Sequence, residues 1–257
     1  MIGTAGRRRS IPKDIFLEIK VPLPTVNIQN EIVENIEKQK QIIDGALQII
    51  KAERESKGIF FEKVDFEKVD LLSIAEITSG GTPLRSRPDY YDNGTIKWLK
   101  SGEVRQGEIY DSEEYITEKG LKNSSAKVFP VDTILLAMYG ATAGQVGILK
   151  VEASTNQAIA GIIVNKDEVL PKYLYYFYQA QTNQFLKLAG GGGQPNISQD
   201  IIKKYQIPIP PLETQRQIVE KLDRQMQALD GVRLLKAEAE KRIEEILAGV
   251  WGKEIDD

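Results

Sequence analysis

The sequence predicts an α+β protein in which one globular α/β domain is combined with two long helices that form an antiparallel coiled-coil rod. Three observations support this fold class. A segment near the amino terminus recurs near the carboxyl terminus, each copy continues into a long run with helical periodicity, and the stretch between the copies contains short β-like runs punctuated by glycine. With 257 residues, the chain is long enough to bury a sizeable core without disulfides.

The internal repeat aligns without gaps. Residues 11–45 match 197–231, and 13 of the 35 aligned positions are identical. Both copies contain a Pro-x-Pro element, at 22–24 and 208–210. Proline fixes its own φ angle and keeps the residue before it out of the helical region, so each long helix should begin just after this element.

Apolar residues then recur at spacings of three and four, as in a coiled-coil seam, and the positions between them are rich in Glu, Lys, Gln and Arg. Helices of roughly 30 and 40 residues would span about 45 and 60 Å, too long for one compact domain. The seams serve either ordinary helix packing or an oligomer interface, and the pattern does not favour one over the other. The candidate subunit-interface residues are Ile32, Ile36, Ile43, Leu47, Leu222, Met226, Leu229 and Ile243.

The segment between the copies, 58–196, has the texture of a globular domain. Apolar runs at 133–139, 145–149 and 159–164 predict strands, and the helical period over 172–188 predicts an amphipathic helix. The aromatic run YLYYFY inside that helix is interpreted as core packing rather than as a base-stacking platform. This segment should therefore form a domain with loop-rich surfaces.

Missing residue types limit the chemistry. Without Cys or His, the chain excludes thiolate zinc sites, Ser-His-Asp triads and HExxH sites. No P-loop occurs, and the glycines of 140–147 are spaced as in a tight hairpin. Pro88-Asp89 could begin a nuclease motif, but no Asp/Glu-x-Lys follows within forty residues. We expect no catalytic residue, metal or cofactor on this chain, with a Mg²⁺-dependent nuclease as a minor alternative.

Hydropathy and charge bear on the cellular location of the chain and on its ligand. No run approaches the ~20 apolar residues of a membrane span, and no apolar stretch follows the amino-terminal arginines, so a cytoplasmic location is expected. The chain has 34 Lys+Arg against 37 Asp+Glu, a balance that does not favour a nucleic-acid partner. From these observations alone, the ligand of the globular domain stays open.

Two basic stretches and a glycine-rich loop nevertheless carry donors suited to DNA. Lys and Arg contact phosphates, whereas Arg, Asn and Gln can read base edges. The candidate DNA-binding residues are Arg85, Arg87, Lys97, Lys100, Ser101, Lys122, Asn123, Ser124, Tyr139, Thr142, Gln194 and Asn196.

Four long stretches closely resemble the specificity (S) subunit of type I restriction–modification systems. They are SGGTPLRSRPDYYDNGTIKWLKSGEV (79–104), ITEKGLKNSSAKVFP (116–130), TILLAMYGATAGQVGILKVEASTNQAI (133–159) and GQPNISQDIIKKYQIPIPPLETQRQIVEKLD (193–223). The resemblance implies target-recognition domains that each read half of a split DNA sequence, alternating with conserved helical regions that set the spacing. It also implies a non-catalytic subunit whose partners are double-stranded DNA, methyltransferase subunits and restriction subunits. S-adenosylmethionine and ATP are expected on those partner subunits.

On this plan the chain divides into a remnant of a preceding recognition domain (1–10), a first conserved helical region (11–57), a target-recognition domain (58–205) and a second conserved helical region (206–257). It thus looks like the C-terminal half of a specificity subunit. Either it is a truncated or recombined product, or it is a half-subunit whose homodimer reads a symmetric split sequence. A further alternative is an assembly adaptor that binds partner subunits without reading DNA.

Overall fold

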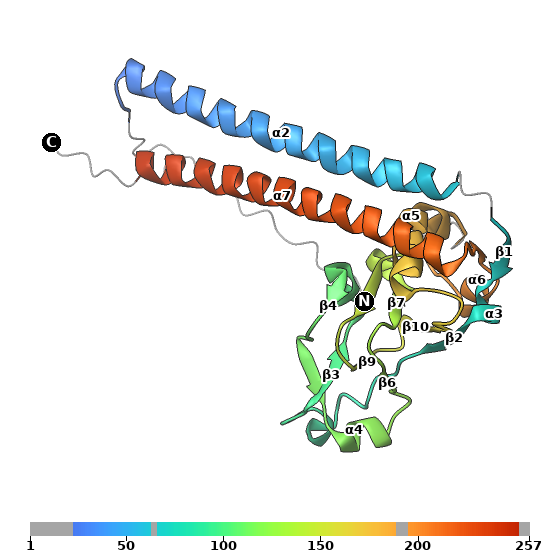
Figure 1. Cartoon of the computed structure of the whole chain (residues 1–257). Coiled ribbons are helices and arrows are strands. Elements are labelled where there is room, and N and C mark those ends of the chain that lie inside the picture. Colours follow the sequence, from blue (N-terminus) through green and yellow to red (C-terminus); the bar gives the residue numbers. More distant parts are fainter. Residues whose placement is uncertain (1–22, 63–65, 189–194, 252–257) are drawn as a thin grey trace. The chain divides into compact units, whose positions relative to one another are not determined.

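The computed structural model describes residues 23–62, 66–188 and 195–251 (Figure 1). The chain separates into two compact units. One, the helical unit, comprises Met1–Ile50 and Leu229–Asp257, and the other, the globular unit, comprises Lys51–Ala228. A mixed α/β domain and two long helices are present, which confirms the predicted fold class.

The two long helices begin where the prolines predict. Helix α2 spans Val26–Glu62 and begins two residues after Pro24, and α7 spans Leu212–Trp251 and begins directly after Pro211. They contain 37 and 40 residues, close to the predicted lengths. The proline elements therefore set the starts of both helices, as the repeat implies.

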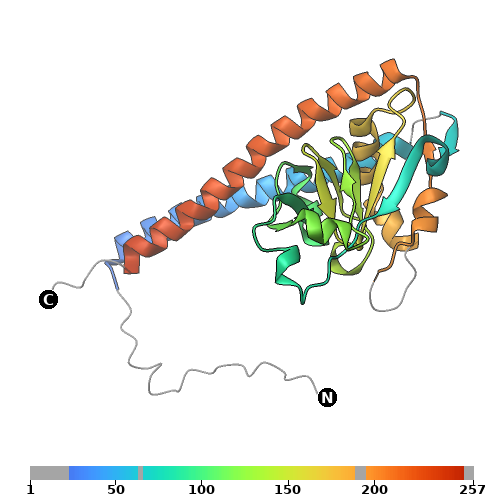
Figure 2. The same ribbon diagram turned by 90° about the horizontal axis from the view of Figure 1, so that it is seen from below.

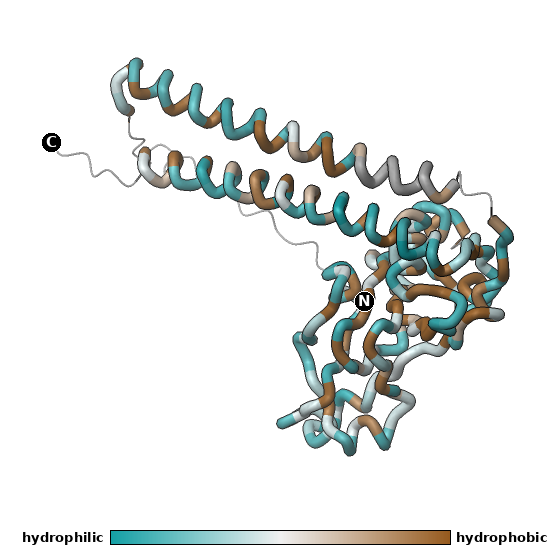
Figure 3. The backbone as a smooth tube through the Cα atoms, in the orientation of Figure 1, coloured by the Kyte–Doolittle hydropathy of each residue, from teal (hydrophilic) through white to brown (hydrophobic). Residues whose placement is uncertain are grey.

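In the helical unit, the first part of α2 lies antiparallel to the last part of α7 (Figures 1 and 2). Ala46 and Ala239 are buried, because small side chains let two helices approach each other. A hollow of about 400 Å³ is lined by residues of both helices, namely Asn35, Gln39, Arg242, Glu245 and Ile246. Figure 3 shows apolar and polar residues alternating along α7 and the coloured part of α2, as expected for coiled-coil helices.

The candidate interface residues fall into two groups. In the helical unit, Leu229 is buried, Leu47 is 47% exposed, and the half-buried members are Ile32, Ile36, Ile43 and Ile243. Leu222 and Met226 lie in the globular unit instead, where Leu222 is a buried core residue and Met226 packs against the same core. Because the core of the same chain covers Leu222, this side chain is not available to another subunit in this structure, whereas the interface role of the half-buried Met226 stays a prediction.

Two glycines interrupt the long helices at equivalent positions of the repeat, Gly45 in α2 and Gly231 in α7. A Cβ atom added at either position would meet no atom within 4 Å. Because glycine costs about 0.5–1 kcal/mol relative to alanine inside a helix, Gly45→Ala and Gly231→Ala should each raise the free energy of unfolding by that amount. Gly161→Ala should lower it, because the new Cβ would lie 2.3 Å from Phe129 Cε1. Thermal melting followed by circular dichroism checks both signs, and a lower melting temperature for the helix variants would contradict the prediction.

The described residues of the globular unit form three sheets. The five-stranded sheet has the order β2 (Ala75–Ser79), β10 (Ile159–Val164), β7 (Ile134–Ala137), β8 (Val146–Leu149) and β4 (Glu108–Ile109). The four-stranded sheet has the order β5 (Glu114–Ile116), β3 (Ile96–Leu99), β9 (Ala153–Thr155) and β6 (Val128–Phe129). The small third sheet pairs β1 (Lys68–Asp70) with β11 (Gln206–Pro208). Neighbouring strands are antiparallel except in the pairs β3–β9 and β4–β8.

Short helices complete this unit. The α-helices are α3 (Leu71–Ile74), α4 (Glu118–Lys122), α5 (Pro171–Leu188) and α6 (Gln199–Lys203), and the 3-10 helices are η1 (Pro88–Tyr90), η2 (Ser101–Gln106) and η3 (Gly140–Thr142). Strands β7, β8 and β10 and helix α5 confirm the elements predicted for the central segment. Residues 138–145 join β7 to its antiparallel neighbour β8, so a hairpin is present, but its connection includes η3 and is longer than the tight turn predicted.

The central strand β7 is buried on both faces. Ile134 and Leu136 point into a core shared with α5, whereas Leu135 and Ala137 point into a second core shared with β6 and β9. This alternation is the period-two pattern of a strand. The aromatic run of α5 lies in the first core, with Tyr173, Leu174 and Tyr178 fully buried, so its interpretation as core packing is confirmed.

The compact unit is larger than the predicted domain of residues 58–205. It spans Lys51–Ala228, Ile218 and Leu222 of α7 belong to its core, and β11 lies beyond residue 205. Within the described ranges, no helix is long and apolar enough to cross a membrane. In the same part of the chain, no three acidic side chains gather closely enough to hold a metal ion.

Candidate nucleic-acid interface

The loop between β2 and β3 carries the first predicted cations and lies against the four-stranded sheet. A Cβ at Gly80 would lie 2.2 Å from the Thr155 carbonyl oxygen, and one at Gly81 would lie 2.4 Å from the Ala126 nitrogen. Only glycine allows such a close approach of backbone to backbone. Trp98 Nε1 donates to the Gly81 carbonyl over 2.9 Å, which fixes the loop to β3.

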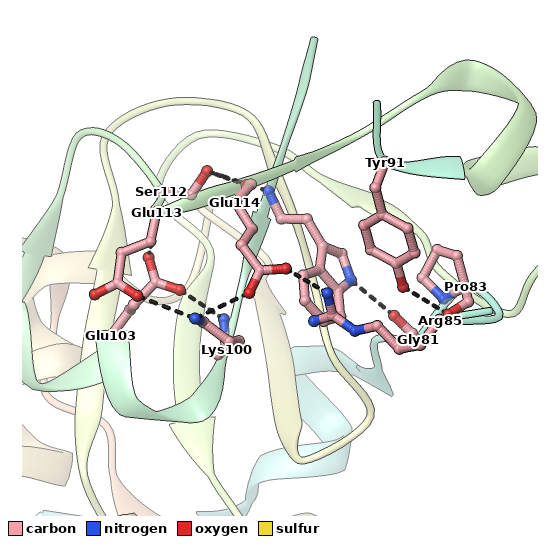
Figure 4. A network of polar contacts seen from close by, with 10 residues as sticks. Gly81, Pro83, Arg85, Tyr91, Lys100, Glu103, Ser112, Glu113 and Glu114 are labelled. Carbon is pink, nitrogen blue, oxygen red and sulfur yellow. Dashed lines mark hydrogen bonds and ion pairs between the residues drawn. The ribbon is translucent and has the colours of Figure 1, made fainter. Parts of the chain in front are cut away.

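Arg85 packs over two aromatic rings that contact each other edge to face. Its guanidinium carbon lies 4.6 Å from the ring centroids of both Tyr91 and Trp98. Its Nη1 donates to Glu114 Oε2, and Tyr91 in turn donates to the Pro83 carbonyl over 2.6 Å (Figure 4). Cation–π contact and a charged hydrogen bond thus fix the plane of the guanidinium, which stays half exposed.

Lys100 lies next to Arg85 in the same network. Its Nζ is 3.0 Å from both Glu113 Oε2 and Glu114 Oε1. The resulting series Glu113, Lys100, Glu114, Arg85 alternates in charge, and we call it the charge chain (Figure 4). Hydrogen bonds from Arg85 hold the pKa of Glu114 below its usual value, and Glu114 followed by Glu113 raises the pKa of Lys100. The ion pairs therefore stabilise the charged forms of Glu114 and Lys100.

A buried carboxylate supports the charge chain from below. Glu103 is 4% exposed, and its two oxygens accept hydrogen bonds from the backbone nitrogens of Lys100, at 2.8 Å, and Glu113, at 2.9 Å. One side chain thereby joins the start of η2 to the strand β5 region. The charge chain consequently has a rigid backbone frame.

The remaining cations of this region are also paired. Arg87 donates two hydrogen bonds of 2.8 Å to Asp89, and Lys119 binds the same carboxylate. Both contacts, that of Arg87 first, lower the pKa of Asp89. Lys97 lies 3.3 Å from Asp111 and over the Tyr115 ring. Every candidate cation from residue 85 to 100 therefore has an acidic partner within the chain.

The candidate residues around α4 differ in whether their donors are already bonded within the chain. Lys122 is exposed, and no acidic group among the described residues lies within ion-pair distance. Asn123 and Ser124 use their donors locally, because they bond the carbonyls of Lys119 and Gly120 at 2.8 Å. These two side chains therefore help to terminate the helix, and their contact with DNA stays a prediction.

A second surface forms where two distant segments meet. Tyr139 and Asn196 are partners in an antiparallel β-bridge, flanked by backbone bonds from Gly140 to Pro195 and from Ile197 to Met138. Both bridge residues are exposed, and we call this surface the Tyr139–Asn196 bridge.

Three candidates remain. Thr142 lies in the turn next to Tyr139 and is half buried. Ser101 begins η2 beside Lys100 and is also half buried. Gln194 lies outside the described residues.

The structure adds supporting residues that the sequence pattern did not indicate. They are Tyr91, Trp98, Glu103, Glu113 and Glu114, which orient Arg85 and Lys100. The sequence signal for them is a cluster of acidic residues after residue 110, and such a cluster is more typical of a solvated face. The arrangement offers a fixed guanidinium and an exposed amide on a β-scaffold, which are suited to contacts with phosphates and base edges.

Comparisons with known proteins agree with this description. Residues 63–241 match the family model described as type I restriction modification DNA specificity domain. The chain is 26% identical over 227 residues to the EcoR124I/EcoR124II specificity subunit of Escherichia coli, covering 81% of this chain and 56% of that protein. It is 36% identical over 159 residues to the MjaIX specificity subunit of Methanocaldococcus jannaschii, covering 60% of this chain and 36% of that protein.

A solved structure shares the fold. The HsdS subunit from Thermoanaerobacter tengcongensis superposes with a TM-score of 0.53 at 16% identity, covering 96% of this chain and 64% of that chain. The chain thus spans roughly a third to two thirds of the length of these three proteins.

Proposed function

The chain belongs to the family of type I restriction–modification DNA specificity domains, and from this premise we propose that its globular unit reads one half of a split target in double-stranded DNA. The observation that carries the proposal is the Tyr139–Asn196 bridge. It exposes an amide able to pair with a base edge and an aromatic ring, and backbone bonds hold both in place. Arg85, fixed against Tyr91 and Trp98, supplies a second polar contact.

We assign the helices to assembly. Several large apolar side chains of the helical unit are exposed, among them Ile42, Ile49, Leu234 and Leu235. Exposed apolar side chains on a rod support binding to other protein subunits. We propose that methyltransferase and restriction subunits bind there, and that a second copy of the chain can do so in a homodimer.

Under this proposal the chain has no catalytic role of its own. Adenine methylation with S-adenosylmethionine and ATP-driven restriction would belong to the partner subunits, and the assembly would work in the cytoplasm. The absence of His and Cys from the sequence is consistent with this division of labour.

The test is selection from random duplexes. The chain, bound to its methyltransferase subunit, is mixed at stated salt with a pool of random double-stranded DNA, and the bound fraction is sequenced. The proposal expects enrichment of a defined sequence. Assembly with the methyltransferase without any enriched sequence would contradict it and favour the adaptor alternative.

A further inference from the structure

Two carboxylates of the charge chain, the exposed Glu113 and the half-buried Glu114, pair with candidate DNA-binding cations. Glu113 and Glu114 contact Lys100 at 3.0 Å, and Glu114 also accepts a bond from Arg85. Arg and Lys side chains are the groups that neutralise a phosphate backbone. In the free protein, Arg85 and Lys100 are instead neutralised from within.

The pairing is built into the backbone rather than made by loose side chains. Glu103 ties the backbone of Glu113 to that of Lys100. Glu114 lies directly opposite Trp98 in the β3–β5 register, so its side chain emerges on the face where Arg85 stacks on the Trp98 ring. The carboxylates are consequently held where the cations are.

Arg85 is only partly engaged by its acidic partner. Glu114 engages a single guanidinium nitrogen, Nη1, and no hydrogen bond to the other two nitrogens comes from the described part of the chain. Stacking fixes the plane of the group, so the remaining donors point in a set direction. An orientation of this kind suits a base edge better than a mobile phosphate contact.

We propose that Glu113 and Glu114 are specificity-determining residues that keep Arg85 and Lys100 from binding DNA phosphates indiscriminately while they hold Arg85 in the orientation for its target. This inference rests on the proposed DNA-reading function. Without the two carboxylates, both cations are free to neutralise phosphates of any sequence, and Arg85 loses the bond that orients it. Affinity for unrelated DNA then rises, and the preference for the target falls.

The test uses the full chain bound to its methyltransferase subunit and a mixed-sequence duplex of about 30 base pairs as the probe. Glu113→Gln together with Glu114→Gln should tighten binding to this duplex about five- to twentyfold near 0.1 M salt, since each released ion pair contributes modestly. The slope of log K against log[salt] should steepen by about 1–2, because each phosphate contact adds roughly 0.9 to it. Affinity for the selected target should rise less than affinity for the mixed duplex.

A matched control separates local release from net charge. Glu118→Gln together with Glu152→Gln makes the same charge change at exposed positions that have no ion pair within the described residues. This pair should change affinity less than about twofold. Equal tightening by both double variants, or no tightening by Glu113→Gln and Glu114→Gln, would overturn the inference.

Two further measurements cover the cases in which the double variant does not fold or the proposed function itself fails. If melting shows that the double variant does not fold, the single change Glu113→Gln, at a side chain 66% exposed, is measured instead, with an expected tightening of about two- to fivefold. The selection experiment judges the proposed function separately, because it uses the native chain. Native enrichment without a change in the variants defeats only this inference, and no native enrichment defeats the proposed function.

Discussion

Replacing Gln215 with alanine is expected to lower the free energy of unfolding by about 2–4 kcal/mol, the cost of leaving buried backbone groups without partners. Gln215 is fully buried at the start of α7. Its Oε1 accepts from the Leu170 nitrogen at 2.8 Å, and its Nε2 donates to the carbonyls of Pro210, at 2.8 Å, and Glu168, at 2.9 Å. One side chain thus ties α7 to the loop between β10 and α5.

The repeat provides a control at the equivalent position. Gln29, at the start of α2, donates to the Pro24 carbonyl at 2.7 Å, the counterpart of the bond from Gln215 to Pro210. Within the described residues, the Gln29 side chain makes no hydrogen bond to a loop of the globular unit, and it is only half buried. Gln29→Ala should therefore cost about 0.5–1 kcal/mol, the value of one local hydrogen bond.

Urea unfolding followed by fluorescence of the two tryptophans and by circular dichroism measures both variants. A loss for Gln215→Ala no larger than that for Gln29→Ala would contradict the assignment of Gln215 as the tie between α7 and the domain.

The second large effect is expected on DNA recognition. Asn196→Ala should weaken binding to the selected duplex roughly tenfold to a hundredfold, the size of one good contact between an amide and a base. Binding to unrelated duplex should change little. The backbone bonds around the Tyr139–Asn196 bridge do not involve this side chain, so the surface should keep its shape.

Lys122→Ala is the matched comparison. An exposed lysine without an ion pair among the described residues suits a phosphate contact, so its loss should weaken selected and unrelated duplexes alike and lower the salt dependence by about 1 unit. Titrations at several salt concentrations separate the two patterns. If Asn196→Ala weakened both duplexes equally, the assignment of Asn196 to base reading would be wrong.

The strands and long helices could be predicted because their signals are local. Runs such as 159–164 are short, apolar and β-branched, and the proline elements mark the starts of α2 and α7. The fate of Leu222 could not be predicted in this way. A heptad position has the same pattern whether a second helix or a domain of the same chain covers it.

The candidate site was predictable only as a set of residue types. Arg85 and Lys100 were identified as cations, but their acidic partners at 113 and 114 come from another strand, and the register between β3 and β5 sets that pairing. Tyr139 and Asn196 were both candidates, but their contact depends on a β-bridge across 57 positions of sequence. Such partnerships arise from tertiary structure, which single-residue patterns do not contain.

The nearly even charge of the domain has a structural explanation. Residues 57–205 hold 17 basic and 18 acidic residues, and Asp89, Asp111, Glu113 and Glu114 each lie in an ion pair with a candidate DNA-binding cation or its neighbour. The weak basic signal therefore reflects internal pairing of cations that are present. Under the proposed function, this balance limits binding to unrelated DNA.

The most direct measurement is a map of methylated adenines in cells that contain this chain and its methyltransferase subunit. If the globular unit reads DNA, methylation is expected within one defined sequence. Exchanging residues 66–210 for the corresponding domain of the Methanocaldococcus jannaschii relative is further expected to change the part of that sequence this domain reads. A methylated sequence that stays the same after the exchange, or a bound methyltransferase that methylates no defined sequence, would contradict the claim that this domain reads DNA.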